Sequence, residues 1–158
     1  ITGPVARASG STFDVRRAHP YCGYEAIDFK VIAEPSTQEH GGDSHDRYLT
    51  HLHEIRESLE IVEQVADHLP REGGCISKKT ESGIRFPRGE SIGRVESPRG
   101  LLSCVIISDG GPKPLRVQFA TPSLSLVHAI PTLLEGMLIE DLSVGLASLN
   151  FSTAEVDR

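Results

Sequence analysis

The sequence has 158 residues, a formal net charge of -6, 38% hydrophobic and 5% aromatic residues, and no Trp. The length fits one domain, but the shortage of large side chains predicts a thin core that neighbouring chains complete. The acidic balance, without a run of Lys or Arg, excludes a nucleic-acid surface, and no apolar run reaches the roughly 18 residues of a membrane-spanning helix. Because the chain begins at Ile rather than Met, we expect a fragment or a processed product.

The first part of the chain, residues 1–42, is expected to be a lead-in that contains one strand. Residues 1–10 carry Gly-Pro near the start and Ser-Gly at the end, which indicates turns or a short helix. Residues 26–32 alternate loosely after Pro20, so they are a candidate strand. Residues 34–42, EPSTQEHGG, are predicted to form a loop.

The longest periodic signal lies in residues 43–69. Apolar residues recur there at steps of three and four, which places them on one side of a helix of about 24 to 26 residues. Asp43 or Ser44 can cap its start, Asp46 adds negative charge to the first turn, and Pro70 with the glycines after it ends the run. A stripe of this length requires partners along all of it. The stripe consists of Tyr48, Leu52, Ile55, Leu59, Val62, Ala66 and Leu69. The side predicted to face water carries Glu54, Arg56, Glu57, Glu60 and Glu63.

Residues 70–90 are polar, contain several glycines and show no periodicity, which predicts a mobile connection. Three runs of strand-forming residues follow at 91–97, 101–108 and 115–121, separated by the turn sequences PRG and DGGP. This pattern predicts a three-stranded antiparallel meander. The middle run is apolar on both faces at residues 105–107, so we expect it to be the central strand, covered by a helix.

Two helices are predicted near the carboxyl terminus. The first covers residues 126–135 and ends at Gly136, and the second has leucines along one face. The predicted fold class is α+β: a long bundle helix and two shorter C-terminal helices packed with a small antiparallel meander. We expect one partial domain over residues 1–158. Its parts are a lead-in (1–42), the long helix (43–69), a loop (70–90), the sheet (91–121) and the C-terminal helices with the tail (123–158). The leucines of the second helix are Leu138, Leu142, Leu146 and Leu149.

Histidines gather around the start of the long helix. A helical zinc site has two ligands at i and i+4, as in HExxH, whereas here Leu49 stands four residues after His45 and Glu57 four after His53. We therefore predict solvated surface histidines and no metal site. The histidines concerned are His40, His45, His51 and His53.

The run from Ser108 to Lys113, SDGGPK, is similar to a phosphate-binding loop, but GxGxxG and GxxxxGK[ST] are both absent and no helix follows. We predict a hairpin turn there. Cys22, Cys75 and Cys104 are widely spaced, so we expect structural thiols in a reducing compartment. The residues alone thus indicate an acidic, helix-rich module without a self-contained active site.

Several motifs resemble, in the same order, those of one family. TGPVARASG, DVRR, PYCGYE and IDFKV resemble the segment TGPxxRxSG, DLRR and PYxxYxxxDF of the 49 kDa-type subunit of NADH-quinone oxidoreductase, the respiratory complex I. GGDSHDRYLTHLHEIRESLEIVEQ resembles that family's GDxxDRY and the long bundle helix after it. The similarity resumes at VESPRGLLSCVIISDGGPKPLRVQFATPS and runs to the terminal EVDR, so it covers most of the chain.

This resemblance implies a fold related to the large subunit of nickel-iron hydrogenases, with a helix bundle and a peripheral sheet but without the metal. It implies an enzyme subunit that packs on the iron-sulfur subunit carrying the last cluster, so that the two frame a quinone cavity. The chain would bind no cofactor itself: NADH and quinone would be substrates of the complex, and the cluster would belong to the neighbour. A peripheral position on the cytoplasmic or matrix side of an energy-transducing membrane follows.

The resemblance also implies site residues. In this family the carboxyl-terminal segment lies near the iron-sulfur subunit, and Arg158 suits such a place because a planar cation stabilises carboxylates or reduced cluster charge. Arg47 is expected to hold an acid from a neighbouring loop. The residues expected at the quinone and cluster interface are Glu155, Val156, Asp157, Arg158 and Asn150. The residues expected to serve as scaffold or subunit contacts are Asp43, Asp46, Arg47, Ser108, Asp109, Gly110, Lys113, Pro114 and Arg116.

The sequence also departs from the family. Ser44 and His45 stand where the family has Cys and Tyr, Asn150 replaces an Asp, and residues 153–154 replace Phe-Gly. The 70–90 connection is too short for a helix with a motif like SMExxIHHFK, and the family's quinone-reducing His and Tyr would precede Ile1. A second hypothesis is therefore a non-catalytic fragment or divergent paralogue that acts as an assembly or interaction module. A membrane-bound hydrogenase relative is disfavoured, because no nickel ligands stand at the end of the chain.

Overall fold

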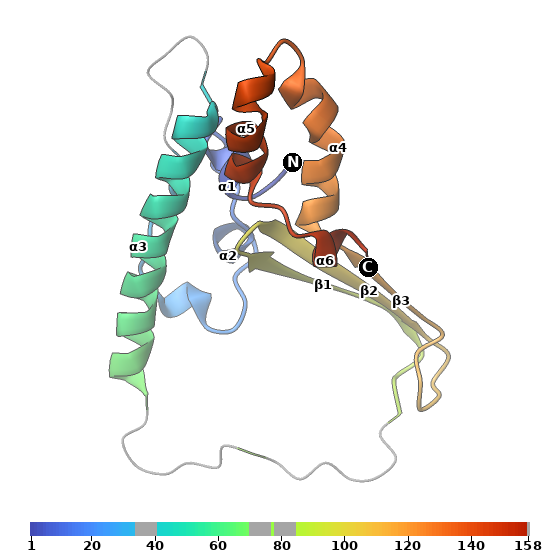
Figure 1. The fold of residues 1–158 in the computed structure, drawn as a ribbon. Helices are drawn as coiled ribbons and strands as arrows, with labels where there is room; N and C mark the ends of the chain where they lie inside the picture. Colours follow the sequence, from blue (N-terminus) through green and yellow to red (C-terminus); the bar gives the residue numbers. More distant parts are fainter. Residues whose placement is uncertain (34–40, 70–76, 78–84, 158) are drawn as a thin grey trace.

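The computed structural model describes residues 1–33, 41–69, 77 and 85–157 (Figure 1). One long helix stands beside two shorter ones, and a three-stranded sheet extends away from the helices. This arrangement confirms the predicted α+β class. The elements in chain order are α1 (Pro4–Arg7), α2 (Val15–Ala18), η1 (Tyr24–Ala26), α3 (Ser44–His68), β1 (Gly89–Ser97), β2 (Gly100–Ser108), β3 (Arg116–Ala120), α4 (Pro122–Leu134), η2 (Ile139–Asp141), α5 (Leu142–Leu149) and α6 (Thr153–Val156).

Some predictions lie outside the described residues. They concern most of the 34–42 loop including His40, most of the 70–90 connection, and the carboxyl-terminal Arg158. Pro70 and Cys75 belong to the second of these segments. Cys22 and Cys104 are free thiols.

The sheet is the predicted antiparallel meander, in the order β1-β2-β3. β1 pairs with β2 from Gly89 opposite Ser108 to Ser97 opposite Gly100, so only two residues form the turn between them. β3 pairs with residues 103–107 of β2, with Arg116 opposite Ile107. The prediction that the apolar middle run forms the central strand is therefore confirmed.

The amino-terminal helix α1 is fixed to the β1–β2 turn by a close backbone approach. A Cβ atom on Gly3 would lie 2.4 Å from Cα of Gly100, so only glycine fits there. The hydroxyl of Thr2 accepts a hydrogen bond from the Leu101 amide at 3.0 Å. The predicted short helical lead-in is thus present, and it positions Arg7 between α3 and the end of β1.

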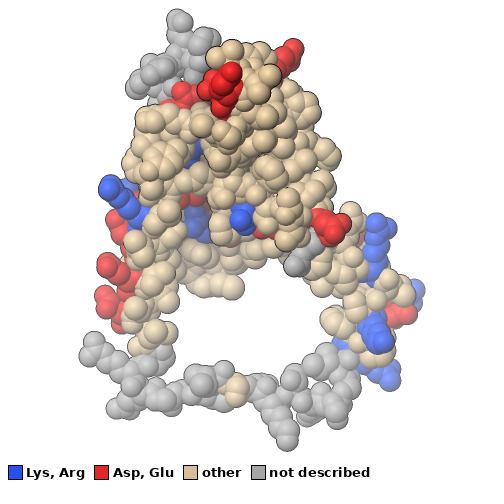
Figure 2. Space-filling model, in the orientation of Figure 1, with Lys and Arg blue, Asp and Glu red and all other residues tan. Residues whose placement is uncertain are grey.

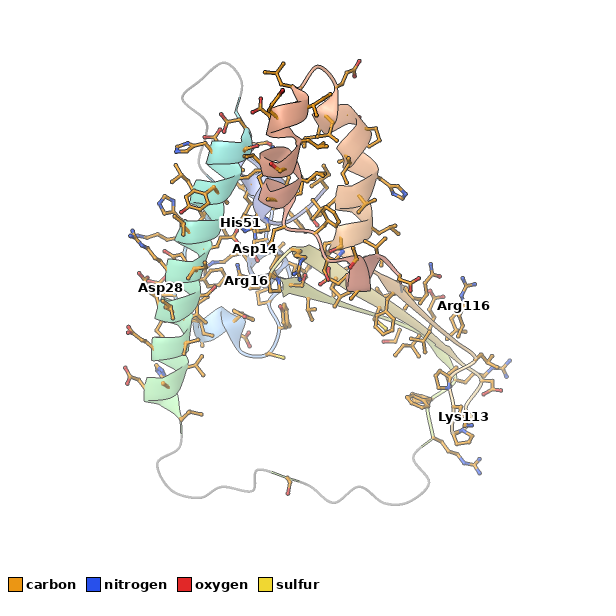
Figure 3. All side chains as sticks on the ribbon, viewed as in Figure 1. Asp14, Arg16, Asp28, His51, Lys113 and Arg116 are labelled. Atoms are coloured by element: carbon orange, nitrogen blue, oxygen red, sulfur yellow. The ribbon has the colours of Figure 1, made fainter. Side chains whose placement is uncertain are left out.

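The predicted strand over residues 26–32 is wrong. The chain forms the single turn η1 and then runs along α3 without pairing to a strand (Figure 3). Side chains of α3 form hydrogen bonds with the backbone of this segment. Gln64 accepts one from the Asp28 amide at 3.0 Å and donates one to the Asp28 carbonyl at 2.6 Å. Glu57 accepts from the Lys30 amide at 2.8 Å. Because these side chains satisfy the backbone, the segment needs no neighbouring strand.

Helix α3 has 25 residues and begins, as predicted, after an Asp43 cap whose side chain accepts from the Asp46 amide. The side buried against the rest of the molecule carries Arg47, Thr50 and Ile61. The apolar stripe lies on another side and faces solvent in the described structure. Its exposed members are Tyr48, Leu52, Ile55, Leu59, Val62 and Leu69.

The prediction that Glu54 and Glu57 belong to a water-facing side is wrong. Glu54 forms an ion pair with the buried Arg7, and Glu57 accepts the hydrogen bond from the Lys30 amide described above. Helical periodicity separates apolar from polar residues, but it does not tell which side meets the body of the protein.

The carboxyl-terminal helices follow the sheet directly. α4 begins at Pro122, four residues before the predicted start, because proline is favoured in the first turn of a helix. It ends before Gly136, whose φ is 80°, as predicted. Leu138 lies outside α5, which begins at Leu142 after the turn η2. The apolar core joins α1, α4 and α5 through Val5, Leu126 and Leu149 and is small, as the composition predicted.

Candidate functional site

The most densely charged interior site surrounds Arg7, which is 1% exposed. Its guanidinium contacts Oε1 of Glu54 at 2.5 Å, Oε1 of Glu96 at 2.9 Å and Oδ2 of Asp14 at 3.5 Å. These carboxylates come from α3, from β1 and from the residue that caps α2. One cation on α1 therefore holds three other elements together. We call Arg7, Asp14, Glu54 and Glu96 the Arg7 cluster.

Burial and charge act in opposite directions on the carboxyl groups of the Arg7 cluster. Burial raises the pKa of Glu96 above 4.5, although Arg7 opposes this shift. Burial also acts to raise the pKa of Asp14, but hydrogen bonds from Arg16 outweigh it, so this pKa lies below 3.8. Arg16 donates from Nη2 to Oδ2 of Asp14 at 2.6 Å. The cluster thus contains one carboxyl group held in its charged form and one that burial shifts toward its protonated form.

His51 lies between two pockets. A pocket of about 350 Å³ is lined by three members of the Arg7 cluster, all but Asp14, together with Arg16, His51 and Asn150. A second, more apolar pocket of about 960 Å³ lies between α3 and α5 and is also lined by His51 and Asn150, together with Tyr48 and Val144. Figure 3 places Asp14, Arg16 and His51 between α3 and the inner end of the sheet.

The imidazole of His51 is constrained by its surroundings. Its Nε2 atom is buried and has no hydrogen-bond partner among the residues that the structure describes. Burial lowers the pKa of His51 below 6.5 and the charge of Arg7 lowers it further, whereas a hydrogen bond with the Ser148 backbone opposes both effects. The prediction of a solvated surface histidine is therefore wrong for His51.

The carboxyl-terminal segment is fixed to the body through Glu155. Its Oε1 atom accepts a hydrogen bond from Nη1 of Arg99 at 3.1 Å, and its Oε2 atom accepts one from the hydroxyl of Ser123 at 2.5 Å. Its backbone carbonyl accepts from the hydroxyl of Thr121 at 2.7 Å, and Arg99 also donates to the carbonyl of Asn150 at 2.7 Å. The structure thus brings Glu155 and Asn150 together through Arg99. Asn150 ends α5 in the left-handed region, with φ of 52°.

The last described residues follow Glu155 and its hydrogen bonds. Val156 is half-buried and Asp157 is exposed, whereas Arg158 lies outside the described residues. The predicted interface role of these residues stays a prediction. Glu155 itself is occupied by contacts within the chain.

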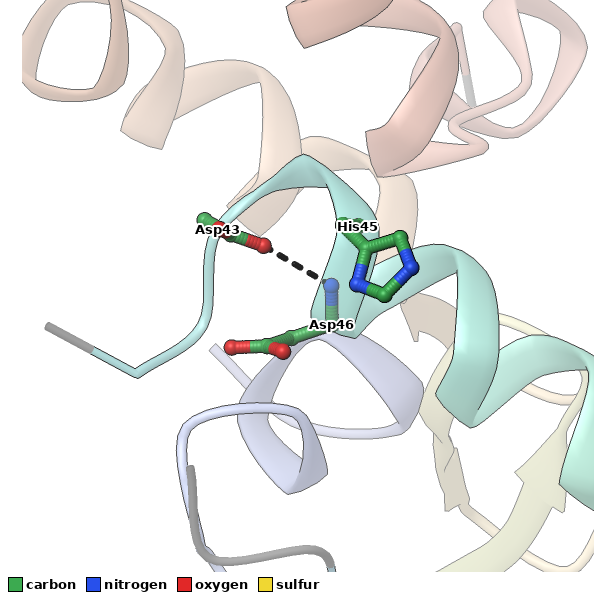
Figure 4. Close-up of side chains that lie close together, drawn as sticks. All are labelled: Asp43, His45 and Asp46. Atoms are coloured by element: carbon green, nitrogen blue, oxygen red, sulfur yellow. Dashed lines mark hydrogen bonds between the residues drawn. The ribbon is translucent and has the colours of Figure 1, made fainter. Parts of the chain in front are cut away.

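The start of α3 has a different chemistry (Figure 4). Arg47, which is 4% exposed, donates to the Gly42 carbonyl at 2.5 Å and to the hydroxyls of Ser44 and Ser148, each at 2.9 Å. Burial lowers the pKa of Arg47, and the charges of Asp43 and Asp46 oppose this shift. Among the described residues, Arg47 donates its hydrogen bonds to hydroxyls and a carbonyl, and its pairing with an acid from the neighbouring loop stays a prediction, because most of that loop lies outside the described residues. Arg47 links α3 to α5.

Asp43, His45 and Asp46 each have a possible metal-ligand atom within 4.8 Å of the others. Both carboxylates already accept backbone hydrogen bonds: Asp43 from the Asp46 amide at 2.8 Å and Asp46 from the Gly42 amide at 2.9 Å. The geometry is that of a helix cap, and nothing further is assigned to it.

The other predicted contact residues lie at the far end of the sheet. Asp109 accepts from the Gly111 amide at 2.9 Å and Gly110 donates to the hydroxyl of Ser108 at 3.1 Å, so this segment is the predicted hairpin turn. Lys113 and Arg116 lie at the same end, away from α3 (Figure 3). The predicted site residues thus occupy three separate places in the fold.

Sequence reasoning missed the residues that organise the interior. Arg7, Asp14, Glu96 and Arg99 all stand inside the motifs TGPVARASG, DVRR and VESPRG. Buried charged residues are rare unless they are paired, so charged positions shared with a family motif were the signal that could have found them.

Comparisons with known proteins agree across the whole chain. The family model described as the 49 Kd subunit of the respiratory-chain NADH dehydrogenase matches residues 1–82 and 75–158. A subunit of the NADH-quinone oxidoreductase of Solibacter usitatus is 35% identical over 100% of this chain and 41% of its own length. A subunit of the F(420)H(2) dehydrogenase of Methanosarcina mazei is 38% identical over 100% of this chain and 42% of its own length.

A solved structure of a membrane-bound sulfane sulfur reductase, an archaeal respiratory membrane complex, contains a similar chain with a TM-score of 0.85 and 34% identity. The match covers 100% of this chain and 42% of that one. This chain therefore spans about two fifths of the length of its relatives. Among its described helices, none combines the length and apolarity that a membrane crossing requires. The chain belongs to the family of the 49 kDa subunit of the respiratory-chain NADH dehydrogenase.

Proposed function

We propose that this chain is part of a subunit of a complex-I-like NADH-quinone oxidoreductase, which packs on the iron-sulfur subunit and helps to shape the quinone-reducing interface. The observation that carries the proposal is the fixed carboxyl-terminal segment. Arg99, Ser123 and Thr121 hold Glu155 in place, so that Val156 and Asp157 are presented at one position on the surface. A docking interface for a cluster-bearing subunit requires such a fixed segment.

Family membership supports a role in a redox enzyme, and the relatives' names show how widely the reactants of such enzymes differ. They include an NADH-quinone oxidoreductase, an F(420)H(2) dehydrogenase and a sulfane sulfur reductase. These names all describe redox enzymes and differ in the reactant. We propose that the chain binds no metal or cofactor itself, that NADH and quinone are substrates of the assembly, and that the iron-sulfur cluster lies in the neighbour. We also propose a peripheral position on the cytoplasmic or matrix side of the membrane.

The test is Glu155→Gln in the assembled complex. The substitution keeps the size of the side chain and removes the charge that Arg99 pairs with, so the carboxyl-terminal segment should shift. We expect quinone reduction to fall roughly 10- to 100-fold, because small displacements near a reacting pair are costly, while electron transfer to an artificial upstream acceptor stays unchanged. Glu140→Gln, at an exposed position in η2, is the matched control. Equal quinone reduction in the original complex and in both variants would contradict the proposed role.

The second candidate is a non-catalytic assembly or interaction module. It is favoured by the fact that both carboxylate oxygens of Glu155 already accept hydrogen bonds within the chain, from Arg99 and Ser123. Restoring the family ending with Asn150→Asp, Thr153→Phe and Ala154→Gly separates the two candidates. A higher rate of quinone reduction in the restored complex supports the enzyme subunit, whereas an unchanged rate supports the module.

A further inference from the structure

The outer half of the sheet extends beyond the helices (Figure 1). We call residues 85–95 and 104–119 the sheet arm. Strand residues alternate between the two faces of a sheet, and apolar side chains are exposed on both faces here. Ile92 is 53% exposed on one face, and Val117 and Phe119 are 45% and 46% exposed on the other. A thin arm with apolar side chains on both faces is typical of a surface that another protein covers.

The outer edge of β1 carries backbone groups that pair with no strand in the described residues. The amide of Glu96 points away from β2 and donates to the hydroxyl of Tyr21 at 2.9 Å. Because backbone direction alternates along a strand, the amides and carbonyls of Arg94, Ile92 and Glu90 point to the same outer side. No strand in the described part of the chain pairs with that edge. Among the described residues, the edge from Glu90 to Arg94 is therefore not covered by another strand, and these residues are exposed.

The sheet arm is basic although the whole chain has a net charge of -6. Its tip is built from two segments: Phe86 donates its amide to the Gly111 carbonyl at 3.0 Å and accepts at its own carbonyl from the hydroxyl of Ser108 at 3.3 Å. Figure 2 shows basic side chains gathered at this end of the molecule. The exposed cations are Arg85, Arg88, Arg94, Lys113 and Arg116, against the exposed acids Glu90 and Asp109.

We propose that the edge of β1 from Glu90 to Arg94 binds an extended acidic segment of a neighbouring polypeptide, which adds a fourth strand to the sheet. Backbone pairing supplies affinity in this mode of recognition, and alternate side chains supply specificity. The basic tip selects acidic side chains in the added strand. A lipid surface would leave the edge amides without partners, so a polypeptide fits this surface better.

The probe is a fluorescein-labelled, acetylated peptide of four Val-Glu repeats, titrated against the full chain and followed by fluorescence anisotropy. We expect saturable binding and slower amide hydrogen exchange at Ile92 and Arg94. Ile92→Pro removes an outward N–H group and leaves the inward bonds to β2, so it should weaken binding at least about tenfold.

The matched control is Val117→Pro, at an outward position on the opposite edge strand β3. The carbonyl of Ile107 accepts from the Leu115 amide, so the backbone groups of Ile107 and Val105 point toward β3. Gln118 stands opposite Val105 and points inward, which leaves the amide of Val117 pointing outward. Val117→Pro should bind the peptide within about twofold of the original chain, because only the other edge has changed.

Circular dichroism and the midpoint of thermal unfolding verify that both proline variants fold. Equal loss of binding in the two folded variants, or no binding by the original chain, would overturn the proposal.

Charge provides the second test. Arg88→Ser and Lys113→Ser should each weaken peptide binding about two- to fivefold, and added salt should reduce these differences. Arg56→Ser on α3, far from the sheet arm, is the control. A Val-Lys peptide that binds as tightly as the Val-Glu peptide would overturn the acidic preference. Binding to vesicles containing anionic phospholipid that Ile92→Pro leaves unchanged, without peptide binding, would point to a membrane instead. None of these outcomes depends on quinone chemistry, so failure here leaves the proposed function untouched.

Discussion

The two sides of α3 differ in what holds them. The side against the body is largely polar: Arg47 bonds to Ser148, and Glu54 pairs with Arg7. The other side carries the apolar stripe, with Leu59 60% and Val62 62% exposed. Buried charge fixes the internal arrangement, because a charged group without its partner is costly and tolerates few alternative positions. The exposed apolar side requires cover that the described residues do not supply. The difference shows that polar contacts hold α3 against the rest of the chain, whereas its exposed apolar side is suited to association with another apolar surface.

The largest expected effect comes from removing the central cation. Arg7→Met leaves Glu54 and Glu96 without the cation that they pair with, so the free energy of unfolding should fall by about 3 to 5 kcal/mol, although Asp14 keeps its ion pair with Arg16. Urea unfolding followed by circular dichroism measures it. Arg56→Met, on the exposed surface of α3, should change it by less than about 0.5 kcal/mol. A loss below about 1 kcal/mol for Arg7→Met would show that the carboxylates find other partners.

The same substitution in the two regions should give different results. Leu126 is 1% exposed in the core and Leu59 is 60% exposed on α3. Leu126→Ala should lower the free energy of unfolding by about 2 to 5 kcal/mol, because it leaves a cavity beside Val5 and Leu149. Leu59→Ala should change it by less than about 0.5 kcal/mol. Similar losses at both sites would mean that the α3 stripe is covered in solution.

The exposed stripe can be tested for association directly. Expressed alone, the chain should self-associate or bind an apolar dye. Introducing charge with Leu59→Glu and Val62→Lys should reduce dye fluorescence severalfold and leave the unfolding midpoint nearly unchanged. Sedimentation and dye titration measure the two properties. A compact monomer that binds no dye would show that the chain has closed its own core.

The smallest effect should be a pH dependence from His51. Its pKa lies below 6.5 in the folded chain, so the unfolded chain binds the proton more readily. The stability that neutral His51 contributes is therefore present above pH 6.5 and is lost as the pH falls through that value toward the folded pKa. His51→Gln should make the free energy of unfolding less dependent on pH in this range, measured by urea unfolding at several pH values. An identical slope in the variant would show that His51 is hydrated.

Much of the fold could be predicted because its signals are local. The cap at Asp43, the length of α3 and the three strands with their turns follow from capping, periodicity and turn chemistry within a few residues. The failed strand at 26–32 had a similar alternation, but Gln64 and Glu57 of α3 satisfied its backbone. Whether this segment pairs with a strand or bonds to side chains of a helix depends on α3, which lies far along the chain, so no local pattern reveals the outcome.

The candidate site was predicted less completely. Family motifs led to Glu155 and Asn150, and the structure joins these two residues through Arg99. The sequence did not single out Arg7, Asp14 or Glu96, because their importance comes from burial and mutual contact rather than from spacing. For the same reason His51 was predicted to be solvated although its Nε2 atom is buried. The predicted roles of Asp43, Asp109 and Lys113 in subunit contacts stay predictions.

The sequence by itself determined the long helix, the three strands, the α+β class and the family, since these rest on short-range patterns and on ordered motifs. Only the tertiary structure decided which side of α3 meets the body, that Arg7 joins four elements, and that the carboxyl-terminal segment is anchored at Glu155. The physical reason is the range of the interactions. Helix caps and turns act between neighbouring residues, whereas a buried ion pair gains its strength from the low-dielectric surroundings that distant parts of the chain create.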